Sequence, residues 1–189
     1  MKTQLTSKPW TYQQMLAQLP PESRYELRDA NLIEMPSPKP KHQTIVSNIY
    51  DIIKPFVKAQ HLGKIFLSPL DVVFQQSNVV QPDLIFVAHD NLSIIKESYV
   101  AGAPDLLVEV VSKGSVARDY IEKKNDYEKF GVKEYWIVDS LNETIWIYAL
   151  DESGKYALFS YAEEEASAQS KLFADFSLAH SSVFEDLAN

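Results

Sequence analysis

The chain of 189 residues contains no cysteine, which excludes disulfide bonds, thiolate zinc sites and cysteine nucleophiles. If the protein binds a metal, we therefore expect oxygen ligands. The sequence also has no apolar run approaching the about 20 residues of a membrane span. Its first residues, MKTQLTSKPW, have no apolar region of the kind found in a secretory signal. These absences lead us to expect a cytoplasmic protein with no membrane partner.

Internal repeats and low-complexity tracts are absent as well, and 46% of the residues are hydrophobic against 23% charged. This is the composition of one ordinary folded domain, long enough to enclose a full core. We therefore predict a single domain over residues 1–189. It would consist of an N-terminal helix and hairpin in 1–40, a core in 41–139, and C-terminal strands with an acidic extension in 140–189.

Basic residues are scarce at the C-terminal end, and this scarcity accounts for the formal net charge of −8. Residues 1–138 hold 16 basic and 16 acidic side chains, whereas residues 139–189 hold 2 basic and 10 acidic ones. Phosphate binding depends on Lys and Arg, but a neutral body with an acidic end can still bind nucleic acid locally. Lysines gather in 38–64 and 113–133. They could line a phosphate-facing cleft or simply form solvated helix faces.

A short apolar run near the middle of the chain, Leu106–Val111, contains one carboxylate, Glu109. The run is too short to span a membrane and is rich in β-branched residues, so it predicts a buried strand in a sheet covered on both faces. A buried carboxylate without a partner is costly. We therefore expect Glu109 to face a Lys, an Arg or a water-filled cleft. The plainer alternative is a structural ion pair at the strand end.

The segment after this strand predicts a helix that begins near Asp119 and ends at Gly131. A carboxylate complements the positive end of the helix dipole, and glycine is favoured just past the last turn. Four side chains at spacings of three and four residues share one stripe of this helix: Tyr120, Lys123, Tyr127 and Phe130. From this aromatic face the Lys123 ammonium could reach Glu109. A surface position is the alternative, and Lys124 is only slightly less well placed.

The N-terminal third of the chain predicts three elements. Residues 11–19 favour a short helix after Pro9, and residues 24–35 alternate around an Asp-Ala-Asn turn as a β-hairpin does. Apolar residues at helical spacing predict a long helix over 41–60, with a kink at Pro55. His42 opens this helix, where a hydrogen-bonded cap is a more common role than a metal ligand.

Three short strands are predicted next, over 64–67, 71–75 and 84–88, and Pro82-Asp83 stands at the head of the third. Proline fixes the backbone there, so Asp83 should project from a defined position. If this strand and the Glu109 strand are neighbours, Asp83 and Glu109 would supply two hard oxygen ligands to a metal. Otherwise Asp83 simply terminates a turn.

The remaining segments complete a pattern of alternating helices and strands. Residues 91–102 are polar and predict an irregular segment or a short helix. Strands are predicted over 134–139 and 144–150, which form a hairpin, and over 155–161. The apolar-periodic segment 172–187 should dock on the sheet.

Together these residues resemble a large family of restriction-endonuclease-like proteins, a domain of unknown function abundant in cyanobacteria, within the PD-(D/E)XK nuclease superfamily. The resemblance rests on Pro82-Asp83 and Glu109, and on Asp119, Lys123 and Tyr127 at four-residue steps, followed by GVKEYWIVD at 131–139. It extends to the N-terminal stretch YELRDANLIEMPSP and the following His42, and so covers nearly the whole chain.

The resemblance implies an α/β fold with a mixed central sheet flanked by helices and an N-terminal β-hairpin. It also implies an endonuclease that hydrolyses DNA phosphodiester bonds, with Asp83 and Glu109 as ligands of Mg²⁺, or Mn²⁺, and Lys123 as the catalytic lysine. Glu26 and His42 match family positions near the same cleft and would be auxiliary residues. A homodimer is expected, because cutting both strands commonly needs two sites.

The chain departs from the superfamily pattern at Val111, where the lysine two residues after the acid is expected. In the family a lysine on the following helix takes that place, which corresponds to Lys123. Two alternatives stay open. One is a non-catalytic module that binds nucleic acid or another partner on the same fold, and the other is a set of acids that form only structural ion pairs.

Overall fold

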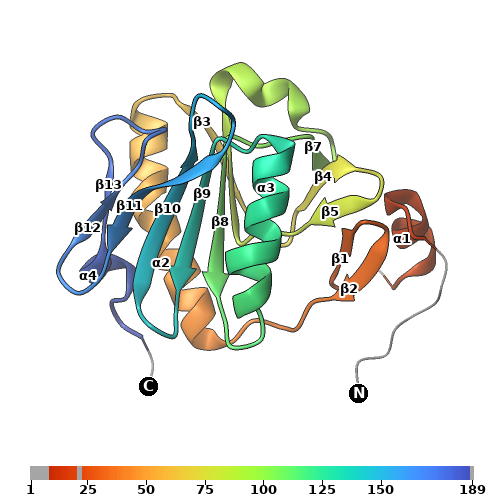
Figure 1. Ribbon diagram of the computed structural model, residues 1–189, viewed down its shortest axis with the longest axis horizontal. Coiled ribbons are helices and arrows are strands. Elements are labelled where there is room, and N and C mark those ends of the chain that lie inside the picture. The colour runs from red at the N-terminus through yellow and green to blue at the C-terminus, as the bar shows by residue number, and fades with distance from the viewer. Residues whose placement is uncertain (1–8, 21–22, 188–189) are drawn as a thin grey trace.

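The computed structural model describes residues 9–20 and 23–187 (Figure 1). A six-stranded sheet has the order β11 (Tyr156–Ala162), β10 (Thr144–Leu150), β9 (Glu134–Asp139), β8 (Leu106–Val111), β6 (Leu84–Ala88) and β3 (Gly63–Leu67). A five-stranded sheet has the order β2 (Asn31–Glu34), β1 (Tyr25–Arg28), β5 (Asn78–Val80), β4 (Asp71–Gln75) and β7 (Tyr99–Ala101).

The helices are α1 (Tyr12–Gln18), α2 (Pro40–Ala59), the 3₁₀ helix η1 (His89–Ile94), the π-helix η2 (Arg118–Lys123), α3 (Lys124–Phe130) and α4 (His180–Val183). Helices flank the sheets, and β1 and β2 form a hairpin near the N-terminal end. The predicted mixed α/β fold with an N-terminal hairpin is therefore confirmed.

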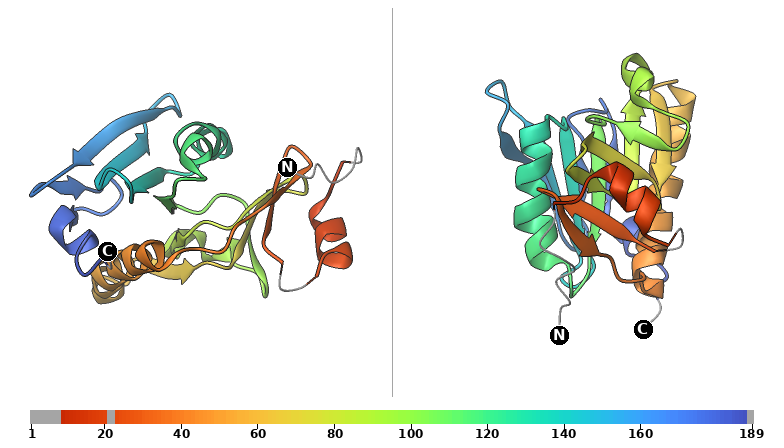
Figure 2. Two further views of the ribbon diagram at one scale, coloured as in Figure 1. Left: turned by 90° about the horizontal axis from the view of Figure 1, so that it is seen from below. Right: turned by 90° about the vertical axis from the view of Figure 1, so that its right-hand side faces the viewer.

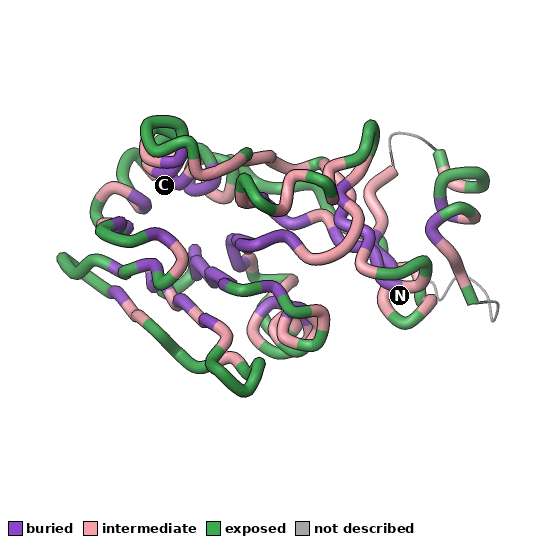
Figure 3. Tube along the Cα trace, turned by 90° about the horizontal axis from the view of Figure 1, so that it is seen from above, coloured by how far each residue is buried: buried purple, intermediate pink, exposed green. Residues whose placement is uncertain are grey.

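The central strand of the fold is β8, which is buried along its whole length. It pairs in parallel with β9 and antiparallel with β6. Because successive side chains of a strand point to opposite faces, Leu106, Val108 and Val110 pack with residues of α2, while Leu107 and Val111 pack with Tyr127 of α3. Figure 2 shows α2 and α3 on opposite sides of this sheet, and Figure 3 shows buried positions concentrated along its strands. The predicted strand covered on both faces is confirmed.

Local sequence signals explain where the helices begin and end. Thr11 and Gln14 form a capping box at α1. Pro40 occupies the first turn of α2, where its missing N–H costs no hydrogen bond, and the helix continues through Pro55. At the end of α3, Gly131 adopts the left-handed conformation with φ 82°, which confirms it as the predicted helix stop.

Four strands were not predicted, and all are only three residues long: β5, β7 and two strands of the C-terminal segment, Ser167–Gln169 and Ser177–Ala179. β5 lies next to β4 and is followed by Pro82, and β7 lies inside the segment that was predicted to be irregular. β7 exists because it pairs in parallel with β4, a partner some 28 residues earlier in the chain, from Asp71 to Tyr99. A three-residue segment has too little periodicity to reveal such pairing.

The C-terminal segment docks on the sheet as predicted, with Phe173, Phe176, Leu178 and Val183 buried in the core on the α2 side. Its secondary structure is a two-stranded sheet, β12 (Ser167–Gln169) with β13 (Ser177–Ala179), followed by α4. None of the helices in the described ranges is long and apolar enough to cross a membrane. The N-terminal stretch used to judge a secretory signal lies mostly outside the described residues.

Candidate active site

The pairing of β6 with β8 brings the two predicted metal ligands together. Its register pairs Leu84 with Val108, and continuing it by one residue places Asp83 opposite Glu109. Side chains directly opposite each other in an antiparallel pair share one face of the sheet. Asp83 is 9% exposed and Glu109 is 5% exposed. Two carboxylates are therefore nearly buried side by side at the head of β6.

Lys123 connects Glu109 to the N-terminal hairpin. Its Nζ atom lies 2.8 Å from Oε1 of Glu109 and 2.9 Å from Oε1 of Glu26. The same Oε1 of Glu109 accepts a 2.6 Å hydrogen bond from the Tyr127 hydroxyl. Glu26 also accepts a 2.9 Å bond from the backbone N–H of Gln81. The predicted partner of Glu109 is thus a lysine that a second carboxylate shares.

Helical spacing delivers both donors to Glu109, since Lys123 and Tyr127 are four residues apart on consecutive helical segments. The first segment, η2, is a π-helix and not the α-helix that the spacing predicted. Such wide turns often occur at functional sites. Lys124 points elsewhere, with its Nζ 4.1 Å from the ring centroid of Tyr148. The geometry therefore assigns the contact with Glu109 to Lys123.

Val111 stands where the superfamily pattern has a lysine. Its side chain is fully buried and packs in the core with Tyr127 and Leu107. A lysine here would have to share the space that Tyr127 occupies. The ammonium that reaches Glu109 comes instead from η2, in keeping with the expectation for this family.

Asp83 has its own set of partners. Its Oδ2 accepts a 2.8 Å hydrogen bond from the backbone N–H of Val110 and lies 3.2 Å from Nε2 of His42. The prediction that His42 caps α2 is wrong, because the N-cap is Lys39 and His42 lies inside the first turn. The first turn of α2 instead directs His42 toward Asp83. The Nδ1 atom of His42 is buried and has no hydrogen-bond partner among the described residues.

Electrostatics in this cluster are unbalanced toward negative charge. Burial raises the pKa of Glu109 well above its ordinary value, although Lys123 lowers it. The charges of Asp83, Asp119 and Glu26 add to that rise. Burial likewise raises the pKa of Asp119 to about 6, against the opposing effect of Lys123. Several carboxylates therefore share one ammonium, an excess that a bound cation would relieve.

Lys123 itself stays charged. Burial lowers its pKa, but the nearby charges of Glu109, Glu26 and Asp119 outweigh burial and raise it above the ordinary value for lysine. Lys123 is only 4% exposed. The site thus contains a permanently protonated ammonium held between carboxylates.

Each of the three clustered carboxylates uses only one of its two oxygens. Among the described residues, no hydrogen bond or ion pair reaches Oδ1 of Asp83 or Oε2 of Glu109, and the same is true of Oε2 of Glu26. The described part of the chain has no group of three or more His, Asp or Glu side chains arranged to hold a metal. A metal here would take few protein ligands, chiefly Asp83 and Glu109.

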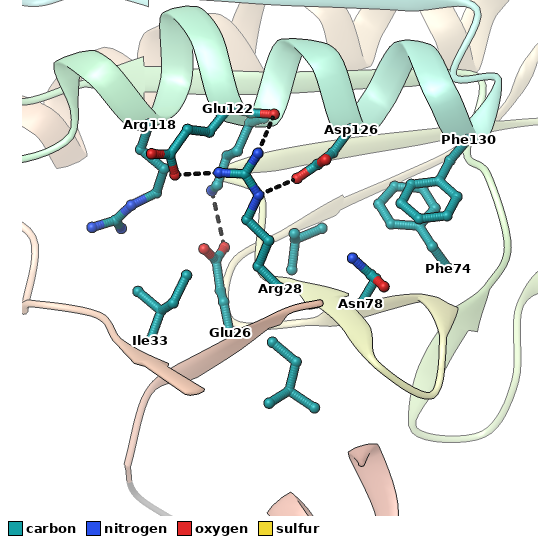
Figure 4. A pocket seen from close by; sticks show the side chains of 12 residues that line it. Glu26, Arg28, Ile33, Phe74, Asn78, Arg118, Glu122, Asp126 and Phe130 are labelled. Atoms are coloured by element: carbon teal, nitrogen blue, oxygen red, sulfur yellow. Dashed lines mark hydrogen bonds and ion pairs between the residues drawn. The ribbon is translucent and has the colours of Figure 1, made fainter. Parts of the chain in front are cut away.

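Sequence reasoning missed the residues that fix the hairpin against the helix. Arg28 of β1 lies between Glu122 and Asp126, with 2.9 Å between its Nε and Oδ2 of Asp126 (Figure 4). These ion pairs close one side of a pocket that Glu26 and Lys123 also line. The alternation of Arg24, Glu26 and Arg28 in the predicted hairpin was the available signal, since it places all three on one face.

Three of the five lysines of the 38–64 segment lie apart from this cluster. Lys54, Lys58 and Lys64 line an open groove of about 630 Å³ together with His61 and His89. This groove is at the Gly63 and Ala88 end of the β3–β6 pair, about 17 Å along β6 from Asp83. The basic groove and the carboxylate cluster are therefore two separate regions.

Comparison with known proteins agrees with this architecture. The chain has a likeness to the crystal structure of a putative nuclease belonging to DUF820 from Anabaena variabilis ATCC 29413, with a TM-score of 0.76 and 22% sequence identity. The match covers 93% of this chain and 98% of that one. At this identity the likeness shows the fold, which confirms the predicted nuclease fold. No curated protein matches the chain.

The family follows from the sequence match. A family model named Uma2 and described as "Putative restriction endonuclease" matches residues 11–181. That range spans most of the 189 residues and includes the hairpin, both carboxylates of the strand pair and the helix that carries Lys123. The chain therefore belongs to the Uma2 family of putative restriction endonucleases.

Proposed function

We propose that the protein is a metal-dependent endonuclease that hydrolyses DNA phosphodiester bonds at the cluster of Asp83, Glu109 and Lys123. The observation that carries the proposal is the pair of adjacent, nearly buried carboxylates beside a buried lysine, each with one oxygen that no hydrogen bond from the described residues reaches. Membership in a nuclease family supports the reaction class. Fold alone would not, because one scaffold can host several functions.

The donor set fits a hard divalent cation. Mg²⁺ prefers oxygen ligands and is commonly held by one or two carboxylates, with water and substrate phosphate filling its other positions. Asp83 Oδ1 and Glu109 Oε2 would be the protein ligands. When bound, the ion supplies Lewis acidity at a phosphoryl oxygen and lowers the pKa of a water molecule. Mn²⁺ accepts the same ligands.

The protein residues position the carboxylates and supply charge. Lys123 and Tyr127 both donate to Oε1 of Glu109, which fixes the carboxylate and leaves its other oxygen available. The backbone N–H of Val110 does the same for Asp83. Because its pKa is raised, Lys123 keeps its proton at Nζ, so we assign it to stabilising negative charge and orienting Glu109, rather than to removing a proton.

His42 and Glu26 are auxiliary in this proposal. His42 contacts Asp83 through Nε2, and Glu26 holds the other side of Lys123. Neither is required as a metal ligand. Cutting both DNA strands would use two copies of the site, so we also propose that the active protein is a homodimer.

The proposal is tested by incubating supercoiled plasmid with the purified protein in Mg²⁺, in Mn²⁺ and in EDTA. We expect metal-dependent nicking that is lost in EDTA. Asp83→Asn and Glu109→Gln should each lower the rate by more than about 100-fold, since even outer-shell partners of a metal site contribute about 10- to 100-fold. Cleavage that persists in EDTA, or in both variants, would contradict the assignment. Binding without cleavage on plasmids of varied sequence would favour the non-catalytic module.

A further inference from the structure

The chain has only three arginines, Arg24, Arg28 and Arg118, and all three gather around the carboxylate cluster. Nη2 of Arg24 donates a 3.0 Å hydrogen bond to Oγ of Ser68. The backbone N–H of Ser68 in turn donates to the carbonyl of Asp83 at 3.2 Å. Arg28 and Arg118 line one pocket together with Glu26 and Lys123. The three arginines are thus concentrated at one place, whereas the 15 lysines occur from Lys2 to Lys171.

Strand pairing brings Arg24 and Arg118 to the same side of the site. Arg24 and Glu26 are two residues apart on the hairpin and share a face. The backbone N–H of Met35 donates to the carbonyl of Arg24 at 2.8 Å, which continues the β1–β2 register and sets Met35 opposite Arg24. Nη1 of Arg118 lies 2.9 Å from Sδ of Met35. Met35 is therefore a neighbour of both arginines, one from the hairpin and one from η2.

The three arginines differ in how their charge is neutralised. Arg28 is held by two carboxylates, Glu122 and Asp126. Among the described residues, neither Arg24 nor Arg118 forms an ion pair with a carboxylate. In Figure 4 the Arg118 side chain extends away from the group around Arg28.

The hydrogen bonds of the two unpaired arginines are also incomplete. The Nε atom of Arg24 is buried and has no partner among the described residues. The acceptor that Arg118 does have is a thioether, which is a weak one. A partly buried guanidinium without an anion carries an uncompensated desolvation cost. No ion pair with a carboxylate of the described residues neutralises Arg24 or Arg118, although the charge of Arg118 lowers the pKa of nearby Asp119, and this favours an external anion at this place.

We propose that Arg24 and Arg118 bind a phosphate group of the nucleic-acid backbone beside Asp83 and Glu109. A guanidinium presents its N–H donors in a planar fork that matches two phosphate oxygens, which lysine cannot reproduce. The two side chains approach from different elements, so a phosphate between them would fix the backbone relative to the carboxylates. This inference rests on the proposed function, because it assumes that the anion is nucleic acid.

The test measures binding without cleavage. A fluorescein-labelled DNA duplex is titrated with the full chain in EDTA at several salt concentrations, and anisotropy gives the dissociation constant. Arg24→Gln and Arg118→Gln should each weaken binding by roughly tenfold. Because both arginines contact the same phosphate, losing that contact should reduce the slope of log affinity against log salt by about 0.9 at most, in the double variant as in either single variant.

The matched control removes two charges from the basic groove. Lys54→Gln with Lys58→Gln leaves the arginines untouched. It should change the slope of log affinity against log salt by less than about 0.9, the value for one phosphate contact. Arg24→Lys with Arg118→Lys keeps the charge and a similar length, so it should retain most of the salt slope while still weakening affinity. Urea unfolding shows whether each variant is folded. If Arg24→Gln with Arg118→Gln is not folded, the variant Arg24→Lys with Arg118→Lys provides the decisive comparison.

The proposal fails if the arginine variants bind as tightly as the unaltered protein, if the groove control loses as much, or if the unaltered protein binds no DNA. Its failure is distinguishable from failure of the proposed function. Asp83→Asn with Glu109→Gln should bind DNA at least as tightly as the unaltered protein. Arginine-dependent binding without cleavage in any metal would leave the phosphate contact standing and remove the nuclease assignment. Cleavage together with DNA binding that does not depend on the arginines would support the nuclease assignment and rule out the phosphate contact.

Discussion

Two groups of buried carboxylates in this fold differ in how completely their oxygens are used. Glu134 accepts from the indole N–H of Trp136 through Oε1, and from the backbone N–H groups of Lys171 and Leu172 through Oε2. Asp139 likewise receives hydrogen bonds at both oxygens, from Leu141, Asn142 and Tyr120. Asp83 and Glu109 are nearly as buried, but within the described part of the chain each has partners at only one of its oxygens.

This difference distinguishes carboxylates that hold the fold together from carboxylates that can bind a cation. Both oxygens of Glu134 are saturated, and the bonds tie the C-terminal segment to β9, so this carboxylate has a structural role. A nearly buried carboxylate with a free oxygen beside like charges lowers the stability of the fold, and folding alone gives no reason to keep it. For Asp83 and Glu109, that loss of stability is explained if the free oxygens bind a cation.

The largest effect on stability should come from Lys123. Lys123→Met leaves Glu26 and Glu109 buried without their shared cation, so we expect the free energy of unfolding to fall by about 3–5 kcal/mol. Lys124→Met, the matched control one residue along, removes only a cation above the Tyr148 ring and should cost about 1 kcal/mol or less. Urea denaturation measures both. Equal losses would mean that the Lys123 contacts are not special.

The next effect is a pH dependence at Asp119. Its pKa is raised to about 6, mainly by burial, so the folded state holds this proton more tightly than the unfolded chain. The stability contribution of Asp119 therefore falls as pH rises from about 4 to about 6, by roughly 3 kcal/mol, and is constant above that range. We expect no such loss of stability in the Asp119→Asn variant, because its side chain does not titrate.

Urea unfolding of both proteins between pH 4 and 7 tests this prediction. The unaltered protein should lose stability relative to Asp119→Asn across that window. Parallel curves would show that Asp119 does not titrate with a raised pKa, and would weaken the case for excess negative charge at the site.

The smallest predicted effect on stability concerns Glu134, whose two oxygens both accept hydrogen bonds. Glu134→Gln replaces an acceptor oxygen by an N–H group that faces the backbone donors of Lys171 and Leu172, and should lower stability by about 1–3 kcal/mol. Plasmid cleavage by the folded variant should be unchanged, whereas Glu109→Gln should abolish it. If Glu134→Gln also stopped cleavage while folded, saturation of the oxygens would not distinguish the two groups.

The sequence predicted those parts of the site that obey local rules. A carboxylate in an apolar run needs a partner, which singled out Glu109, and helical spacing singled out Lys123. Pro82 fixed the position of Asp83 at the head of a strand, and the strands of the central sheet are largely where the alternation of apolar residues placed them. Each of these signals lies within a few residues of the position it predicts.

The rest depends on contacts between distant segments. Glu109 and Glu134 both stand in or beside apolar strands, and nothing in their neighbourhoods reveals that one is saturated. The donors to Oε2 of Glu134 come from a loop 37 and 38 residues later, and only the donor to Oε1, Trp136, is close in sequence. Arg118 contacts Met35, which is 83 residues earlier. His42 was predicted as a cap because a helix start was visible in the sequence, but Asp83 was not visibly close to it.

The central claim is that the free oxygens of Asp83 and Glu109 bind a divalent cation, and titration calorimetry with Mn²⁺ and Mg²⁺ tests it most directly. We predict binding to the unaltered protein and to Glu134→Gln, and its loss in Asp83→Asn and in Glu109→Gln. Binding that survives in the Asp83 and Glu109 variants, or is absent from the unaltered protein, would contradict the account.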